Sequence, residues 1–183
     1  RKKPLTKNIC DGIYTAVMTD TGCFRYSNTD KKCYDIAIES LNKGVKTYKI
    51  YQHVYENSSP ERMNLLGLVL AEINYEFNGM FAWFEVSEKM IKKAKAGVKD
   101  VDGFSDMVRS IRGVEISMMI METGVNSCRI NFRSKGKLKV RDLANYLGGG
   151  GHAYAAGAKV EESILSFKNG LLGDIKQLIR TKV

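Results

Sequence analysis

Residues 114–134 read VEISMMIMETGVNSCRINFRS, a stretch in which two apolar runs flank a short turn. The runs at residues 114–122 and 125–134 are rich in β-branched and other apolar side chains, which predicts two strands. Thr123 and Gly124 lie between them and predict a hairpin turn. We therefore expect two consecutive strands joined by a hairpin.

Helical and extended segments alternate around this hairpin. Residues 80–87 predict a strand, Ser87 is placed to cap a Lys-rich helix that ends near Gly97, and residues 104–111 predict a second short helix. After the hairpin, residues 140–147 predict a helix and residues 158–160 a strand, followed by closing helices. This order predicts an α/β fold class, with a mixed sheet flanked by helices.

The polar stretch Asn57–Pro60 is the best candidate for a domain boundary. Helices are expected before it at residues 5–18 and 31–41, and residues 1–57 are too few to bury a core alone. We expect them to be the end of a larger domain whose beginning is missing from the chain. Residues 58–79 predict a linker helix, and residues 80–183 a second domain.

The apolar side chains at residues 63–77 of the expected linker helix form two stripes, so the helix should be buried on more than one side. The second stripe predicts packing either on the missing domain or on a second copy of the chain, as in a homodimer.

The 183-residue chain carries a formal net charge of +9, with 44% hydrophobic residues. The apolar fraction excludes wholesale disorder, and the excess of Lys and Arg favours phosphate-bearing partners. No apolar run approaches the roughly 18 residues of a membrane span, and residues 1–8 do not lead into a signal peptide. The four cysteines form no Cys-x-x-Cys pair, which predicts reduced thiols and no zinc site. We expect a soluble cytoplasmic protein that does not associate with membranes.

Residues 128–141 read CRINFRSKGKLKVR and combine a strand pattern with a cluster of bases. A period of two places Cys128, Ile130 and Phe132 on the face toward the core. The alternate positions form a cationic face: Arg129, Asn131 and Arg133. Residues 123–141 contain six bases and no acid, so the local field is positive. The alternative is that this run is only a solvated face.

Residues 148–157 read GGGGHAYAAG. Four successive glycines can expose their N–H groups in a concave nest, where an oxyanion approaches the backbone closely. His152 follows directly and can donate to a phosphate or stack on a base. The segment matches neither a dinucleotide-binding fingerprint nor the phosphate loop of nucleoside triphosphatases, so we exclude both classes. The alternative is that the glycines merely turn the chain.

Residues 19–26 read TDTGCFRY and place Asp20 between two hydroxyl side chains. This composition favours a turn. Asp20 could also be one ligand of a metal site, but a hard cation needs several ligands and no second cluster is visible nearby. The chain contains two histidines, His53 and His152, so a self-sufficient site for two metals is not expected.

Three motifs together resemble the later part of a DHH-type phosphoesterase. They are Thr-Asp-Thr-Gly-x-Phe-Arg at residues 19–25, Phe-Arg-Ser-Lys-Gly at 132–136 and Gly-Gly-Gly-Gly-His-x-x-Ala-Ala-Gly at 148–157. The resemblance runs over essentially the whole chain and is strongest to the nano-RNA nuclease and phosphoadenosine-phosphate (pAp) phosphatase branch, related to RecJ. It implies that residues 1–57 are the remnant of the DHH catalytic domain and residues 80–183 the DHH-associated substrate-binding domain.

The resemblance also implies a manganese-dependent hydrolase that degrades nano-RNA and dephosphorylates pAp. Asp20 matches one manganese ligand of the family. The family's Asp-x-Asp and Asp-His-His motifs do not occur in the chain, so we expect the chain alone to be inactive. Six positions match the family's substrate-binding motifs: Arg133, Ser134, Gly149, Gly150, Gly151 and His152.

In this interpretation Arg133 clamps a phosphate of a short RNA or nucleotide and Ser134 donates a hydroxyl hydrogen bond. The glycine N–H groups and His152 then hold the terminal nucleotide. Two alternatives stay open: a stand-alone nucleic-acid-binding module, and a phosphoesterase for polyphosphate or cyclic dinucleotides.

Overall fold

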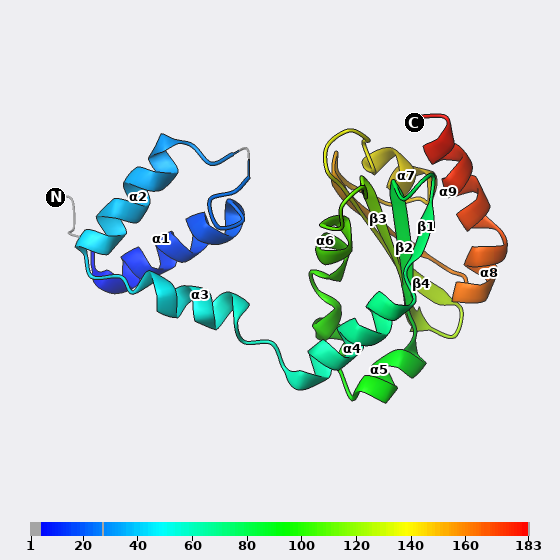
Figure 1. Cartoon of the computed structure of the whole chain (residues 1–183), viewed down its shortest axis with the longest axis horizontal. Coiled ribbons are helices and arrows are strands. Elements are labelled where there is room, and N and C mark those ends of the chain that lie inside the picture. Colours follow the sequence, from blue (N-terminus) through cyan, green and yellow to red (C-terminus); the bar gives the residue numbers. More distant parts are fainter. Residues whose placement is uncertain (1–4, 27, 183) are drawn as a thin grey trace. The chain divides into compact units, whose positions relative to one another are not determined.

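The computed structural model describes residues 5–26 and 28–182 and divides the chain into two compact units, Arg1–Ser58 and Ser59–Val183. The division falls within the polar stretch Asn57–Pro60 that the sequence singled out. Each unit has its own helices and its own buried cluster, and each is described by itself below (Figure 1).

Unit 1, Arg1–Ser58, is helical in its described part. Its helices are α1 (Lys7–Asp20), α2 (Lys31–Asn42) and α3 (Thr47–Tyr55). Thr6 and Asp30 cap the first two, each accepting a hydrogen bond from a backbone N–H of the first turn. The buried cluster is small: Cys10, Tyr14, Met18 and Val45. Helix α3 was not expected from the sequence, although Ile50, Tyr51, Val54 and Tyr55 recur at helical spacing; none of its residues is buried.

The described part of unit 2 contains a six-stranded sheet with the order β1-β2-β3-β4-β6-β5. The strands are β1 (Asn74–Glu76), β2 (Phe81–Val86), β3 (Ile116–Gly124), β4 (Ser127–Ser134), β5 (Gly150–His152) and β6 (Ala155–Val160). β2 and β3 pair in parallel, and the other neighbouring pairs are antiparallel. The expected α/β class with a mixed sheet is therefore confirmed. The predicted hairpin is the β3–β4 pair, but Thr123 and Gly124 lie within β3, and the turn falls at residues 125–126 instead.

Helices cover both faces of this sheet (Figure 1). One face carries α4 (Pro60–Ala71), α5 (Glu88–Ala94), the 3₁₀ helix η1 (Val98–Val101) and α6 (Phe104–Arg109). The other face carries α7 (Arg141–Tyr146), α8 (Ile164–Asn169) and α9 (Leu171–Arg180). The two faces bury separate apolar clusters, because successive side chains of each strand point to opposite sides.

The segment expected as a linker helix, residues 58–79, has a different structure. Its helix α4 ends at Ala71, and Leu65 and Val69 pack into the core of unit 2 with no exposed surface. The chain then forms β1, which pairs with β2. The connecting turn has φ of 52° at Phe77 and 54° at Asn78, the left-handed backbone that tight hairpins require. This turn ends the apolar helical pattern that the sequence extended to Phe77.

All four cysteines are free thiols, as expected, and Cys10 and Cys128 are buried. Among residues 5–26 and 28–182, no helix is long and apolar enough to cross a membrane.

Candidate functional site

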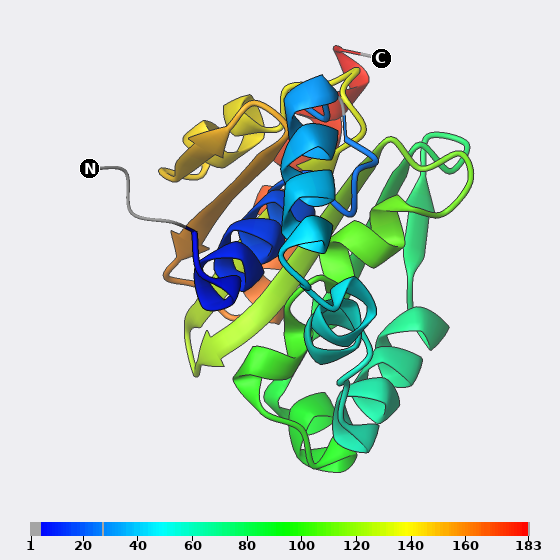
Figure 2. The same ribbon diagram turned by 90° about the vertical axis from the view of Figure 1, so that its left-hand side faces the viewer.

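On the side where α4 to α6 pack, the described helices of unit 2 leave β4, β5 and β6 mostly uncovered. The apolar cluster beneath these helices contains side chains of β2 and β3, and none of β4, β5 or β6. Figure 2 shows that the orange strand β6 and the teal strand β1 lie toward opposite edges of the sheet. We call the uncovered half the open face. By alternation and register, its residues are Arg129, Asn131, Arg133, Gly150, His152, Ala155, Gly157 and Lys159.

The strand register brings Arg133 and His152 to the same part of the open face. Arg133 lies opposite Ala155, and Ala155 lies opposite His152. Paired residues of antiparallel strands project to the same side, so both side chains stand on the open face with only a methyl group between them. Two strand spacings separate their backbones by about 10 Å. The His152 side chain is exposed, and it has no hydrogen-bond partner within the described residues.

Protein contacts hold the Arg133 guanidinium on one edge. Its Nε donates to Oδ2 of Asp106 at 3.3 Å, and its Nη1 donates to the carbonyl of Phe132 at 3.1 Å. The same carboxylate contacts Arg109, with 3.2 Å between Asp106 Oδ1 and Arg109 Nη2. A guanidinium has five N–H donors, so most of the Arg133 donors stay available to a ligand. Its side chain is 31% exposed.

Neither Asp106 nor Arg109 was expected at this site from the sequence. Residues 104–111 predicted a helix, and α6 is that helix, but no local pattern connects it with a strand 25 or so residues later. The connection arises because α6 packs beside β3 and reaches the end of β4, where Arg109 Nη1 donates to the carbonyl of Ser134 at 3.2 Å.

Ser134 is not on the open face, contrary to the interpretation that it donates to a phosphate. It is buried, and its hydroxyl donates to Oε1 of Glu115 at 2.9 Å and accepts from the N–H of Gly136 at 3.0 Å. Glu115 also accepts from the N–H of Lys137 at 2.8 Å. Ser134 follows Arg133 in the strand and therefore points to the other side. Its role in this structure is to fix the loop after β4.

The glycine run does not form a nest of four available amides. The N–H of Gly148 donates to the carbonyl of Asn145 at 3.0 Å, and that of Gly149 donates to Ala144 at 2.8 Å, which closes α7. Residues 150–152 then form the edge strand β5. Packing explains two of the glycines, because a Cβ at Gly149 would collide with the carbonyl oxygen of Gly157 and one at Gly151 would lie 2.7 Å from Ala156 Cα.

Gly150 and Gly157 carry no side chain in the middle of the open face, which leaves room for the Asn131 amide. They lie opposite each other in β5 and β6, and Gly157 lies opposite Asn131 of β4. A Cβ at Gly157 would be 3.0 Å from Oδ1 of Asn131, so the Asn131 amide lies close over this glycine. An amide side chain both donates and accepts hydrogen bonds, as the edge of a nucleobase does. The sequence placed Asn131 on this face but gave it no role.

Asp20, the predicted metal ligand, is the last residue of α1 in unit 1. Its side chain is exposed, and Oδ2 accepts a hydrogen bond from Asn28 Nδ2 at 3.0 Å. In the part of the chain that the structure describes, no group of three or more His, Cys, Asp or Glu side chains could hold a metal ion. A single carboxylate does not fit a site for two manganese ions, so we derive no hydrolytic step for this chain.

The loop after Asp20 has an unusual backbone. Gly22, Cys23 and Phe24 have φ of 55°, 59° and 61°, three successive residues in the left-handed region. The hydroxyl of Thr21 supports the loop by accepting from the N–H of Phe24 at 3.0 Å. The conformation is therefore that of a tight, locally hydrogen-bonded turn, as the composition of residues 19–26 predicted.

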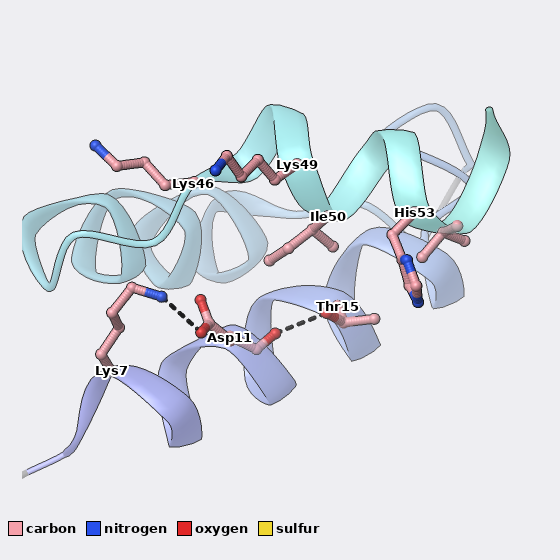
Figure 3. Close-up of a pocket in the computed structure, with 8 residues that line it drawn as sticks. Lys7, Asp11, Thr15, Lys46, Lys49, Ile50 and His53 are labelled. Atoms are coloured by element: carbon pink, nitrogen blue, oxygen red, sulfur yellow. Dashed lines mark hydrogen bonds and ion pairs between the residues drawn. The ribbon is translucent and has the colours of Figure 1, made fainter. Parts of the chain in front are cut away.

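The other histidine, His53, lines a cavity of about 600 Å³ between α1 and α3 (Figure 3). In Figure 3 His53 extends from α3 toward α1, and Lys7 points to Asp11, with 2.8 Å between Lys7 Nζ and Oδ2. Lys46 and Lys49 complete the polar lining, and both are exposed. No polar side chain among the described lining residues is buried, so the cavity carries no mark of a built ligand site.

Comparison with known proteins places this geometry in a family. The DHHA1 domain family matches residues 84–181. A bifunctional oligoribonuclease and PAP phosphatase NrnA of Thermus thermophilus is 31% identical over 159 residues, which cover 85% of this chain and 46% of the relative. The NrnA protein of Bacillus subtilis is 25% identical over 148 residues, 81% of this chain and 46% of the relative.

A solved structure shares the fold over nearly the whole chain. The exopolyphosphatase-related protein from Bacteroides fragilis superposes with a TM-score of 0.88 at 28% identity, covering 97% of this chain and 52% of that protein. The chain spans about half the length of the curated relatives it matches. Because the family match covers more than half of the 183 residues, the chain belongs to the DHHA1 domain family.

Proposed function

We propose that the open face binds the phosphate-bearing end of a short RNA or nucleotide, as the substrate-binding part of a phosphoesterase. The observation that carries the proposal is the placement of Arg133 and His152 on one uncovered face, with Ala155 between them in the register. A guanidinium matches the geometry of phosphate oxygens, and an imidazole can hydrogen-bond a phosphate or stack on a base. The net charge of +9 supports a polyanionic ligand.

The proposed division of labour follows from the contacts. Arg133 binds the phosphate with the donors that Asp106 and Phe132 do not use. Asn131, whose amide covers Gly157 at the centre of the face, is placed to hydrogen-bond a base. His152, on the edge strand β5, forms one border of the site. Binding in this way positions the ligand and involves no bond-making step by these residues.

We propose further that a full-length protein of this family hydrolyses short oligoribonucleotides and pAp, in line with the names of the NrnA relatives. Manganese then requires ligands besides Asp20. The 183-residue chain alone should release no nucleotide monophosphate from a short RNA in the presence of manganese. Robust release by the purified chain would contradict this.

The experiment that tests the binding function is Arg133→Ala in a fluorescence titration with a labelled short oligoribonucleotide. Loss of a charge-assisted hydrogen bond should weaken binding by about 2 kcal/mol, which is roughly 30-fold. Loss of one phosphate contact should also reduce the slope of log K against log salt by about 0.7. Arg180→Ala is the matched control, because Arg180 is exposed on α9, on the covered side of the sheet.

Unchanged affinity in Arg133→Ala would overturn the placement of the ligand. An end-blocked oligonucleotide separates the proposal from a stand-alone nucleic-acid-binding module, since only the module binds blocked and free ends equally. Inorganic polyphosphate is a second candidate ligand, favoured by the description of the Bacteroides fragilis structure as exopolyphosphatase-related. If polyphosphate displaced the RNA while a nucleotide did not, the substrate class would be polyphosphate.

A further inference from the structure

Two cations lie opposite each other at the far end of the open face. Arg129 of β4 pairs in register with Lys159 of β6. Residues in such a position have Cβ atoms about 5 Å apart, and like charges there are destabilising unless an anion compensates them. The strand pair therefore keeps an unfavourable arrangement at this place.

The partners of these two cations do not fully compensate them. Among the described residues Arg129 forms no ion pair, its Nε is buried without a hydrogen-bond partner, and its Nη2 contacts Met121 Sδ at 3.6 Å. Lys159 Nζ lies 2.7 Å from Oε1 of Glu161, but both side chains are mostly exposed, so water screens the pair. Glu161 pairs with Lys159 alone, and Arg129 has no carboxylate partner among the described residues, so a positive charge remains at this end.

The distance from Arg133 to the Arg129–Lys159 pair supports a role for this pair in ligand binding. Arg129 precedes Arg133 by four residues in the same strand and on the same face, which is a distance of about 13 Å. Each nucleotide of a single strand carries one phosphate, so a chain of a few nucleotides crosses that distance. Between the two arginines the Asn131 amide lies over Gly157, and Gly150 beside it carries no side chain.

We propose that Arg129 and Lys159 form a second phosphate subsite, which binds an internal phosphate of an oligonucleotide whose terminal nucleotide lies at Arg133 and His152. The proposal rests on the function proposed for the open face and specifies its substrate class as an oligonucleotide of a few nucleotides. A mononucleotide reaches the Arg133 end alone. A chain of regularly spaced phosphates suits two fixed cationic points on a rigid strand, and the neighbouring Asn131 suits a nucleobase.

The test compares two probes, adenosine monophosphate and a tetraadenylate, by titration at constant salt. Arg129→Ala should weaken tetraadenylate binding about tenfold, and the double variant Arg129→Ala, Lys159→Ala should weaken it further. The affinity of both variants for the monophosphate should change less than about twofold. Arg129→Lys should recover part of the loss, because it keeps the charge. Arg180→Ala is the control for the removal of an exposed arginine, and thermal unfolding of each variant checks the fold.

Each contrary result has a definite meaning. If Arg129→Ala weakened both probes equally, or neither probe while Arg133→Ala weakened both, the second subsite would be wrong and the function of the open face would stand. If neither variant weakened tetraadenylate, the proposed function itself would fail. An acidic peptide of equal charge that displaced tetraadenylate at equal concentration would contradict the nucleotide class.

Discussion

The two sides of β4 differ in what covers them and in what their residues do. On the covered side Cys128, Ile130 and Phe132 have no exposed surface and pack under α7, α8 and α9. On the open side the alternate residues remain partly exposed, and their polar groups bond to few protein partners. One strand therefore contributes stability through one set of residues and a ligand surface through the other, and the two sets can be changed separately.

The largest expected effect is on the covered side. Phe132→Ala removes a fully buried ring, which should lower the free energy of unfolding by about 3–5 kcal/mol. Asn131→Ala, its neighbour on the open side, should lower it by less than about 1 kcal/mol. Urea unfolding of the two variants measures both values, and equal losses would remove the distinction between the two sides.

A smaller effect is expected where α6 meets the open side. If Asp106 positions the Arg133 guanidinium, Asp106→Ala should weaken short-RNA binding about fivefold, or about 1 kcal/mol, whereas Asp106→Asn keeps an acceptor and should retain most of the affinity. If the carboxylate instead competes with the ligand's phosphate, both variants should bind more tightly. Asp142→Asn is the control, since Asp142 is similarly exposed and paired with Lys182.

At neutral pH the smallest expected effect concerns the thiol of Cys128. Burial, with a contribution from the charge of Glu122, raises the pKa of this thiol to about 11. An unfolded cysteine ionises near pH 8.5, so between that pH and about 11 the unfolded chain loses a proton that the folded chain keeps, and stability falls as pH rises. At pH 8 a thiol reagent should label Cys23, which is partly exposed, well before Cys128. Equally fast labelling would indicate that β4 is not closed on this side.

The features that depend only on neighbouring residues were predictable from the sequence. Period two assigns the residues of β4 to two faces without knowledge of the rest of the fold, and the structure has that assignment. The same holds for the pairing of β3 with β4 and for the helix at residues 104–109, because apolar periodicity is a property of neighbouring residues. The hairpin turn itself lies two residues later than the sequence predicted.

The contacts between residues far apart in the sequence were not predictable. Asp106 meets Arg133 across 27 residues, and nothing in residues 104–111 distinguishes this carboxylate from a solvated one. The sequence suggested a ligand role for Ser134 because its actual partner, Glu115, lies just before β3, 19 residues earlier in the chain. The glycine run suggested a nest, but α7 takes two of its amides and close packing of β5 on β6 explains two of its missing side chains.

The central claim is that a phosphate-bearing ligand binds to the open side of the sheet. Amide chemical shifts of the isotope-labelled chain, followed while a short oligoribonucleotide is added, test it most directly. The claim predicts saturable shifts that are largest along β4, β5 and the facing end of β6, at Asn131, Arg133, Gly150 and His152. Largest shifts in α8 and α9, on the covered side, would contradict it.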